Sequence, residues 1–101
     1  KIVRRFGTGS YPLGIRANLS WETSSSTLAG GETLLLYSDG LYEARDASDA
    51  PFGEERIERT VRLLAGSRPQ ELVSDLSRQL NSFLGSRLPE DDVSIAAVKK
   101  K

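Results

Sequence analysis

The sequence contains neither cysteine nor histidine, and these two absences exclude several kinds of site. Without cysteine, the chain can form no disulfide and no thiolate metal site. Without histidine, it lacks the commonest general base and the commonest nitrogen ligand for zinc or copper. Any metal bound by its side chains must therefore be held by oxygen atoms, which favours magnesium, manganese or calcium.

The chain also lacks net charge and long apolar runs. Basic and acidic residues number 14 each, so neither nucleic acid nor an anionic membrane surface is favoured as a partner. No apolar stretch approaches the roughly 18 residues of a membrane span, and no signal peptide is visible, so we expect a cytoplasmic protein without membrane insertion. The length of 101 residues predicts one small domain with a modest core.

The apolar pattern predicts three strands in the first part of the chain. Residues 2–6 alternate like a strand that is already under way, which favours a piece of a longer domain, and residues 18–27 predict an exposed strand. Residues 33–38, with the sequence TLLLYS, form a continuous apolar run. A continuous run predicts a strand that is covered on both faces.

Two helices and a last strand are predicted after these strands. The first helix spans residues 54–66, and the second begins with Ser67 as N-cap, with Gln70 completing a capping box, and ends at Gly85. Residues 93–98 predict the last strand. The apolar stripes of the two helices predict the core, and they comprise Ile57, Val61, Leu64, Leu72, Leu76, Leu80, Phe83 and Leu84.

Strands grouped before helices predict an α+β domain with mostly antiparallel strands and two adjacent helices before the last strand. The acidic segment at residues 46–53 lacks the spacing of an EF-hand calcium loop, so we expect a solvated loop there. The lysines at residues 99–101 are expected to form a solvated tail. Residues 1–101 are thus interpreted as a single partial domain.

Two aspartates flank the helical part of the chain. Asp39 follows the apolar run, and Asp91 stands about fifty residues later, where the last strand is expected to begin. If these strands are antiparallel neighbours, both carboxylates lie at one edge of the sheet, where a divalent cation would relieve their repulsion. Gly40 would let the backbone turn sharply beside the metal. Alternatively, Asp39 and Gly40 simply form a turn and Asp91 caps the start of the strand.

The stretch GETLLLYSDGLYEARD, followed by PEDDVSIAAVK, resembles the metal-dependent protein serine/threonine phosphatases of the protein phosphatase 2C-like (PPM) superfamily. The stretches FGEERIERTV and PLGI match the bacterial branch named for stage II sporulation protein E. The resemblance covers residues 12–98. It implies that the chain is the C-terminal half of an α-β-β-α sandwich, in which two antiparallel sheets stack between helices.

The resemblance also implies a site and a reaction. Asp39 and Asp91 would be metal ligands, Gly40 and Asp92 would support the metal site, and no catalytic residue beyond the ligands is implied. Glu43 matches a residue usual in this branch, without an assigned role. The complete domain of the family binds two Mn²⁺ or Mg²⁺ ions, whose bridging water attacks phosphoserine or phosphothreonine. The substrate would be a phosphoprotein, such as an anti-sigma-factor antagonist in bacterial signalling.

The chain departs from the family pattern in one respect. The family domain is about twice as long, and two further aspartate motifs of its N-terminal half do not occur here. We therefore expect the isolated chain to bind metal weakly and to be inactive. Exposed strand edges predict a homodimer or pairing with the missing N-terminal half. Two alternatives stay open, namely a non-catalytic phosphatase-like interaction module and a generic α+β domain whose motifs are accidental.

Overall fold

The computed structural model describes residues 4–5, 25–64 and 66–101. The strand predicted at residues 2–6 and most of that predicted at 18–27 lie outside this part, and the described residues 25–27 are not in a strand. Five elements follow one another in the described chain: β1 (Thr33–Tyr37), α1 (Asp39–Tyr42), α2 (Glu54–Leu64), α3 (Pro69–Leu84) and β2 (Ile95–Lys99).

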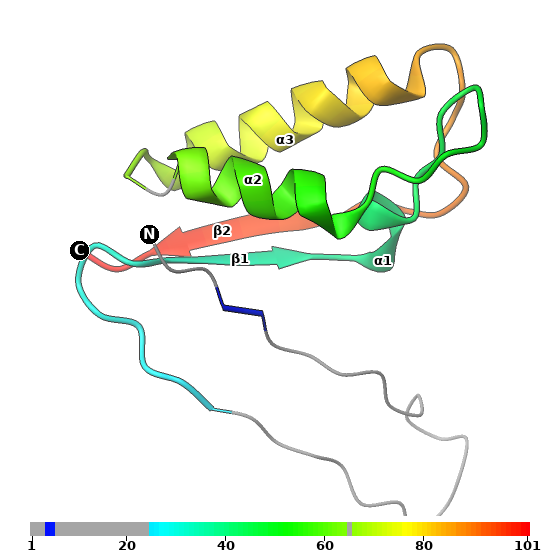
Figure 1. The fold of residues 1–101 in the computed structure, drawn as a ribbon. Coiled ribbons are helices and arrows are strands. Elements are labelled where there is room, and N and C mark those ends of the chain that lie inside the picture. The colour runs from blue at the N-terminus through cyan, green and yellow to red at the C-terminus, as the bar shows by residue number, and fades with distance from the viewer. Residues whose placement is uncertain (1–3, 6–24, 65) are drawn as a thin grey trace, which may run out of the picture.

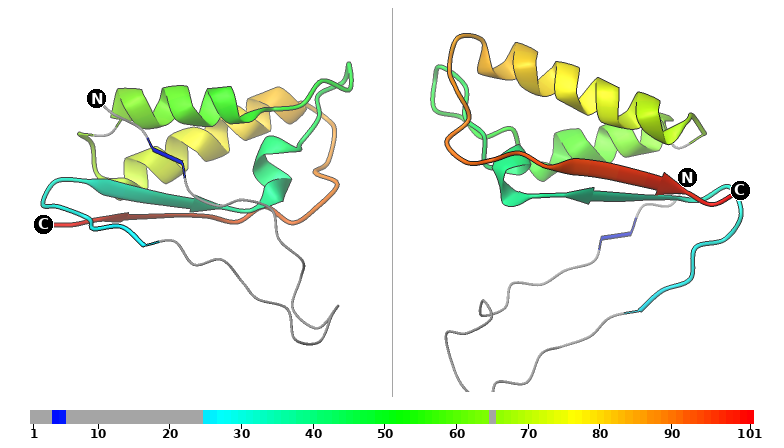
Figure 2. Two further views of the ribbon diagram at one scale, coloured as in Figure 1. Left: turned by 60° about the horizontal axis from the view of Figure 1, so that its bottom comes forward. Right: turned by 180° about the vertical axis from the view of Figure 1, so that it is seen from behind.

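The two strands form one antiparallel sheet with helices on one side. In the pairing of β1 with β2, Tyr37 lies opposite Ile95 and Thr33 lies opposite Lys99. The helices α2 and α3 lie side by side over one face of this sheet (Figure 1), and the same layering is visible in the two views of Figure 2. The α+β class and the two adjacent helices before the last strand are therefore confirmed, in the form of a partial α+β domain.

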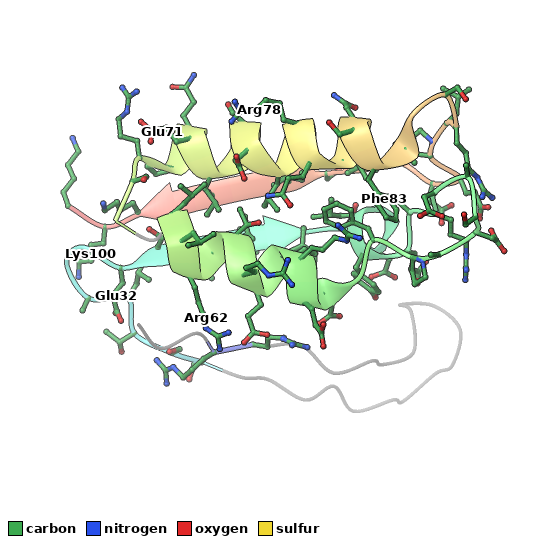
Figure 3. The ribbon with its side chains drawn as sticks, turned by 45° about the horizontal axis from the view of Figure 1, so that its top comes forward. Glu32, Arg62, Glu71, Arg78, Phe83 and Lys100 are labelled. Carbon is green, nitrogen blue, oxygen red and sulfur yellow. The ribbon has the colours of Figure 1, made fainter. Side chains whose placement is uncertain are left out.

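The core lies between the helices and the covered face of the sheet. Leu41, Leu72 and Leu76 are its largest fully buried side chains. Phe52 and Phe83 meet edge to face, with their ring centroids 5.3 Å apart, and Figure 3 shows Phe83 on the side of α3 that faces α2. The predicted stripes of both helices are confirmed, because all their members are buried or pack against the buried cluster.

The strand β1 is covered on one face only, so the prediction of cover on both faces is wrong for the described chain. Partly buried and exposed side chains alternate along the strand, and Leu34 and Leu36 are 41% and 52% exposed. Val98, which pairs with Leu34 across the sheet, is 52% exposed on the same face. The physical reason is that both helices cover the opposite face, where Leu35 packs against the core.

The start of α3 also differs from the prediction. Its N-cap is Arg68 rather than Ser67, and no side chain caps the helix. Pro69 explains the shift, because the residue before a proline is driven to an extended backbone, and Arg68 has φ −69° and ψ 148°. Ser67 instead belongs to the turn after α2, where its N–H donates to the carbonyl of Leu64 at 2.9 Å. Gly85 ends α3 as predicted, with φ 59°.

The C-terminal lysines are not all tail. Lys99 is the last residue of β2, and its Nζ donates to the carbonyls of Gly66 and Ser67 at 3.4 Å. The N–H of Lys100 donates to the carbonyl of Glu32 at 3.1 Å, and the two residues lie at the same end of the sheet (Figure 3). The tail predicted at residues 99–101 therefore begins later, because β1 offers backbone partners up to this point.

Candidate metal centre

Asp39 lies at the end of the sheet where β1 finishes and β2 begins. It is the first residue of α1, a single helical turn that leaves the sheet at this end (Figure 1). Leu41 is fully buried and holds the turn against the core, whereas the side chain of Asp39 is exposed. The predicted position of Asp39 at the sheet edge is confirmed, but the backbone there is helical rather than a simple turn.

Gly40 is the point where the segment of Asp39 contacts the segment of Asp91 and Asp92. A Cβ built on Gly40 would lie 3.3 Å from the carbonyl oxygen of Asp91 and would overlap the carbonyl oxygen of Asp92. Gly40 is buried inside α1 and is not among the glycines with positive φ. The expected sharp turn at Gly40 is therefore wrong, and glycine is required because the backbone of Asp91 and Asp92 comes so close.

Ser38 joins the same two segments through hydrogen bonds. Its Oγ donates to the carbonyl of Asp92 at 3.2 Å and accepts from the N–H of Ser94 at 2.9 Å. Its own N–H donates to the carbonyl of Ser94 at 3.0 Å. Sequence reasoning missed this role. The available signal was a hydroxyl residue placed directly between an apolar strand and an aspartate, a position that favours side-chain bonds to nearby backbone.

Asp91 and Asp92 lie in the segment between α3 and β2. Both side chains are exposed, and the strand begins only at Ile95. The last strand, predicted from residue 93 with Asp91 and Asp92 at its entrance, therefore begins two residues later than expected. Val93 is partly buried against the core, so the chain is fixed there before pairing begins. The antiparallel pairing on which the meeting of the two segments depends is confirmed.

Tyr42 is a further residue of this edge that sequence reasoning missed. Its hydroxyl donates to Oδ1 of Asp39 at 3.0 Å. This hydrogen bond, assisted by desolvation and by the negative charge of Asp39, raises the pKa of Tyr42 above its usual value. The phenol therefore stays a neutral donor that orients the carboxylate of Asp39. The spacing of three residues was the available signal, because such residues are neighbours on one helical turn.

The carboxylates of Asp39 and Asp91 are donors of the type that suits a hard divalent cation. Carboxylate oxygens are the ligands that Mg²⁺ and Mn²⁺ prefer. Among residues 4–5, 25–64 and 66–101, no three or more acidic, histidine or cysteine side chains are grouped so that they could hold a metal. Glu43 is exposed and still has no assigned role.

Asp39, Asp91 and Asp92 form what we call the acidic edge, and all three are exposed. Two hollows, one between α2 and α3 and one around the start of α2, have volumes of about 430 and 370 Å³. Arg56 lines both, and neither Asp39 nor Asp91 lines either of them.

Comparison with known proteins identifies the kind of domain that carries this edge. The chain is a phosphatase-related domain. It belongs to the Stage II sporulation protein E (SpoIIE) family, whose model matches residues 3–101. No curated protein and no solved structure matches the chain significantly. In the part of the chain that the structure describes, no helix has the length and apolar character needed to cross a bilayer.

Proposed function

We propose that this chain forms part of a metal-dependent phosphoprotein phosphatase that hydrolyses phosphoserine or phosphothreonine in bacterial cytoplasmic signalling. The observation that carries the proposal is the contact of Gly40 with the backbone of Asp91 and Asp92. This contact brings the segments of both candidate ligands to one end of the sheet. Membership of the SpoIIE family supports the same reaction class.

Asp39 and Asp91 would hold Mn²⁺ or Mg²⁺ at this edge, with Gly40 and Asp92 in supporting positions. Two bound ions would supply an activated bridging water and would stabilise the negative charge on the phosphoryl oxygens. The chain itself contributes orientation, because Tyr42 bonds to the carboxylate of Asp39. Two carboxylates do not complete a hexacoordinate shell, so we expect weak metal binding and little or no hydrolysis by residues 1–101 alone.

A non-catalytic interaction module is the second candidate, and the uncovered face of the sheet favours it. Leu34, Leu36 and Val98 are exposed together on this face. An apolar sheet face of this kind is typical of an interface. A second copy of the chain, or the N-terminal half of a family domain, would be the partner. In this alternative, Asp39 and Asp91 would be dispensable for binding.

The test of the metal site is a titration of the ¹⁵N-labelled chain with Mn²⁺, whose paramagnetism broadens the amide signals of nearby residues. We expect selective broadening around Asp39 and Asp91 in the wild type, and its loss in Asp39→Asn and Asp91→Asn. Glu55→Gln is the matched control, since it removes the same charge from an exposed side chain at the start of α2. Uniform broadening in all variants would count against the ligand assignment.

The test of the reaction uses the complete phosphatase domain that contains this chain. We expect Asp39→Asn and Asp91→Asn to lose most of the phosphate release from a phosphoserine protein, without a change in fold. Glu55→Gln should retain it. Near-normal turnover of the aspartate variants at saturating Mn²⁺ would refute the ligand assignment, whereas a wild-type domain without turnover would favour the interaction module.

A further inference from the structure

Arg87 connects two loops that border the acidic edge. One guanidinium nitrogen donates to the backbone carbonyl of Asp46 at 2.8 Å and to Oδ1 of Asp49 at 3.2 Å. The other nitrogen forms an ion pair with Glu90 at 3.0 Å. One side chain, placed just after α3, therefore bonds to a loop that precedes α2 and to the residue immediately before Asp91.

The loop on the first side of this connection is continuous with the Asp39 segment. Asp46 follows α1 by a few residues, and its Oδ1 accepts from the N–H groups of Ser48 and Ala50 at 2.9 Å each. Asp49 has a positive φ of 66°, and its carbonyl accepts from Arg45 at 2.7 Å. The carboxylate of Asp46 thus shapes the loop, and its carbonyl accepts from both the N–H of Asp49, at 2.9 Å, and Arg87.

The segment on the other side carries Asp91 between two bonded residues. Arg87 bonds to the side chain of Glu90, and Ser38 bonds to the carbonyl of Asp92. Only Asp91 lies between them. A residue held on both sides has fewer backbone conformations to lose when its carboxylate binds a ligand.

Electrostatics gives the arginine a second effect. Asp49 and Glu90 are both acidic and would repel each other without a cation between them. Arg87 contacts both, but Asp49 is 69% exposed and Glu90 is 65% exposed, so solvent screens these pairs and this second effect is small. The planar guanidinium presents separate N–H donors to the two loops, which a lysine ammonium cannot reproduce.

We propose that Arg87 is a positioning residue that holds the Asp91 segment in register with the segment that follows Asp39. Its effect on metal binding rests on the proposed function, whereas its effect on the placement of the two loops does not. Arg87 contacts no candidate ligand side chain directly, so it acts through Glu90 and through the loop at Asp46 and Asp49.

The experiment compares wild type, Arg87→Gln and Arg87→Lys with the control Arg78→Gln. Arg78 forms an i,i+3 ion pair with Asp75 on α3, so its loss removes an arginine pair away from both loops. Without metal, ¹⁵N relaxation and cross-relaxation between protons of residues 46–49 and 87–90 report the placement of the segments. With Mn²⁺, amide broadening reports its dissociation constant.

We expect Arg87→Gln to lose the cross-relaxation between the loops and to lower the order of residues 90–92, while the midpoint of thermal unfolding stays close to that of Arg78→Gln. The dissociation constant for Mn²⁺ should rise about tenfold, as for other residues that orient metal ligands. Arg87→Lys should recover part of both effects, because it restores the charge but not the planar fork.

Unchanged order and cross-relaxation in Arg87→Gln would overturn the proposal. It would also be overturned if the loops loosened but Mn²⁺ affinity stayed at the wild-type value. If the wild type showed no effect of Mn²⁺ at Asp39 and Asp91, the proposed function would fail. The metal-free measurements would then decide the positioning role of Arg87 by themselves, with loosening in Arg87→Gln supporting it.

Discussion

The two faces of the β1–β2 sheet have similar apolar sequences and opposite surroundings. On the covered face, Leu35, Tyr37 and Ile95 pack against the core beneath α2 and α3. On the uncovered face, Leu34 and Leu36 are exposed although they are of the same residue type as Leu35. Exposed apolar patches of this kind are typical of interaction sites, because an apolar sheet face is costly to leave in water.

This comparison explains why the continuous apolar run was misleading. A strand that is apolar on both faces predicts two covered faces, and the described chain supplies helices for only one. The contribution of the uncovered face to the free energy of unfolding therefore depends on whether a partner chain or a further segment covers it. Substitutions on the covered face should change the stability of the chain by itself, whereas substitutions on the uncovered face should change it only when a partner is bound.

The largest difference is expected between two leucines of equal size on the two sides. Leu76→Ala should lower the free energy of unfolding by about 2–5 kcal/mol, because the side chain is fully buried and leaves a cavity. Leu36→Ala should change it by less than about 0.5 kcal/mol, as for other exposed positions. Urea unfolding of both variants measures the difference.

A loss of unfolding free energy in Leu36→Ala that grows with protein concentration would contradict the expected contrast between the two faces. It would show that a second copy covers the outer face, and sedimentation velocity would reveal the dimer. A similar loss for both variants in a strictly monomeric chain would contradict the assignment of covered and uncovered faces.

A smaller effect is expected at the junction between the covered core and the open acidic edge. Gly40→Ala should lower the free energy of unfolding by about 1–3 kcal/mol, because the new methyl group would overlap the carbonyl of Asp92. The amide signals of Asp91, Asp92 and Ser94 should shift with it. Gly30→Ala is the control, because a Cβ there would lie 3.5 Å from its nearest neighbour, the carbonyl oxygen of Lys101. A neutral Gly40→Ala without shifts at Asp91 would refute the close approach.

The smallest effect is expected at a surface ion pair of α2. Arg5 donates a hydrogen bond to Glu58 and, chiefly through it, holds the pKa of Glu58 below its usual value of 4.5. Because this carboxylate has a lower pKa in the folded chain than in the unfolded one, the pair stabilises the fold above about pH 4.5 and loses this effect as the pH falls below it.

Arg5→Gln should therefore reduce the loss of stability between about pH 6 and about pH 3, as measured by urea unfolding at each pH. Arg68→Gln, which removes an exposed pair with Glu71, is the control. The expectation fails if Arg5→Gln and the wild type lose the same stability over this range.

The sequence predicted the helices and the core better than the site. Apolar periodicity identified α2, α3 and their buried residues, because periodicity records which face of a helix meets the core. It did not identify Leu41 and Phe52 as core residues, since both lie outside long periodic segments. The capping box at Ser67 failed because the proline two residues later moved the N-cap to Arg68.

For the candidate site, the sequence supplied the two aspartates and the antiparallel pairing that brings their segments to one end of the sheet. It did not supply the contacts that join these segments, in which Gly40 and Ser38 meet the backbone near Asp92. Nor did it indicate Arg87 or Tyr42. Some of these contacts join residues far apart in the chain. The contact of Tyr42 depends on a single helical turn, and four residues are too few to show a helical pattern in the sequence.

The sequence alone determined the secondary structure of the second half of the chain, the absence of nitrogen and sulfur ligands, and membership of the SpoIIE family. The tertiary structure alone decided which face of the sheet is covered, why Gly40 must lack a side chain, and how Arg87 connects two loops. The physical reason is that residue pattern is a local property, whereas cover, close approach and charge pairing depend on segments that only folding brings together.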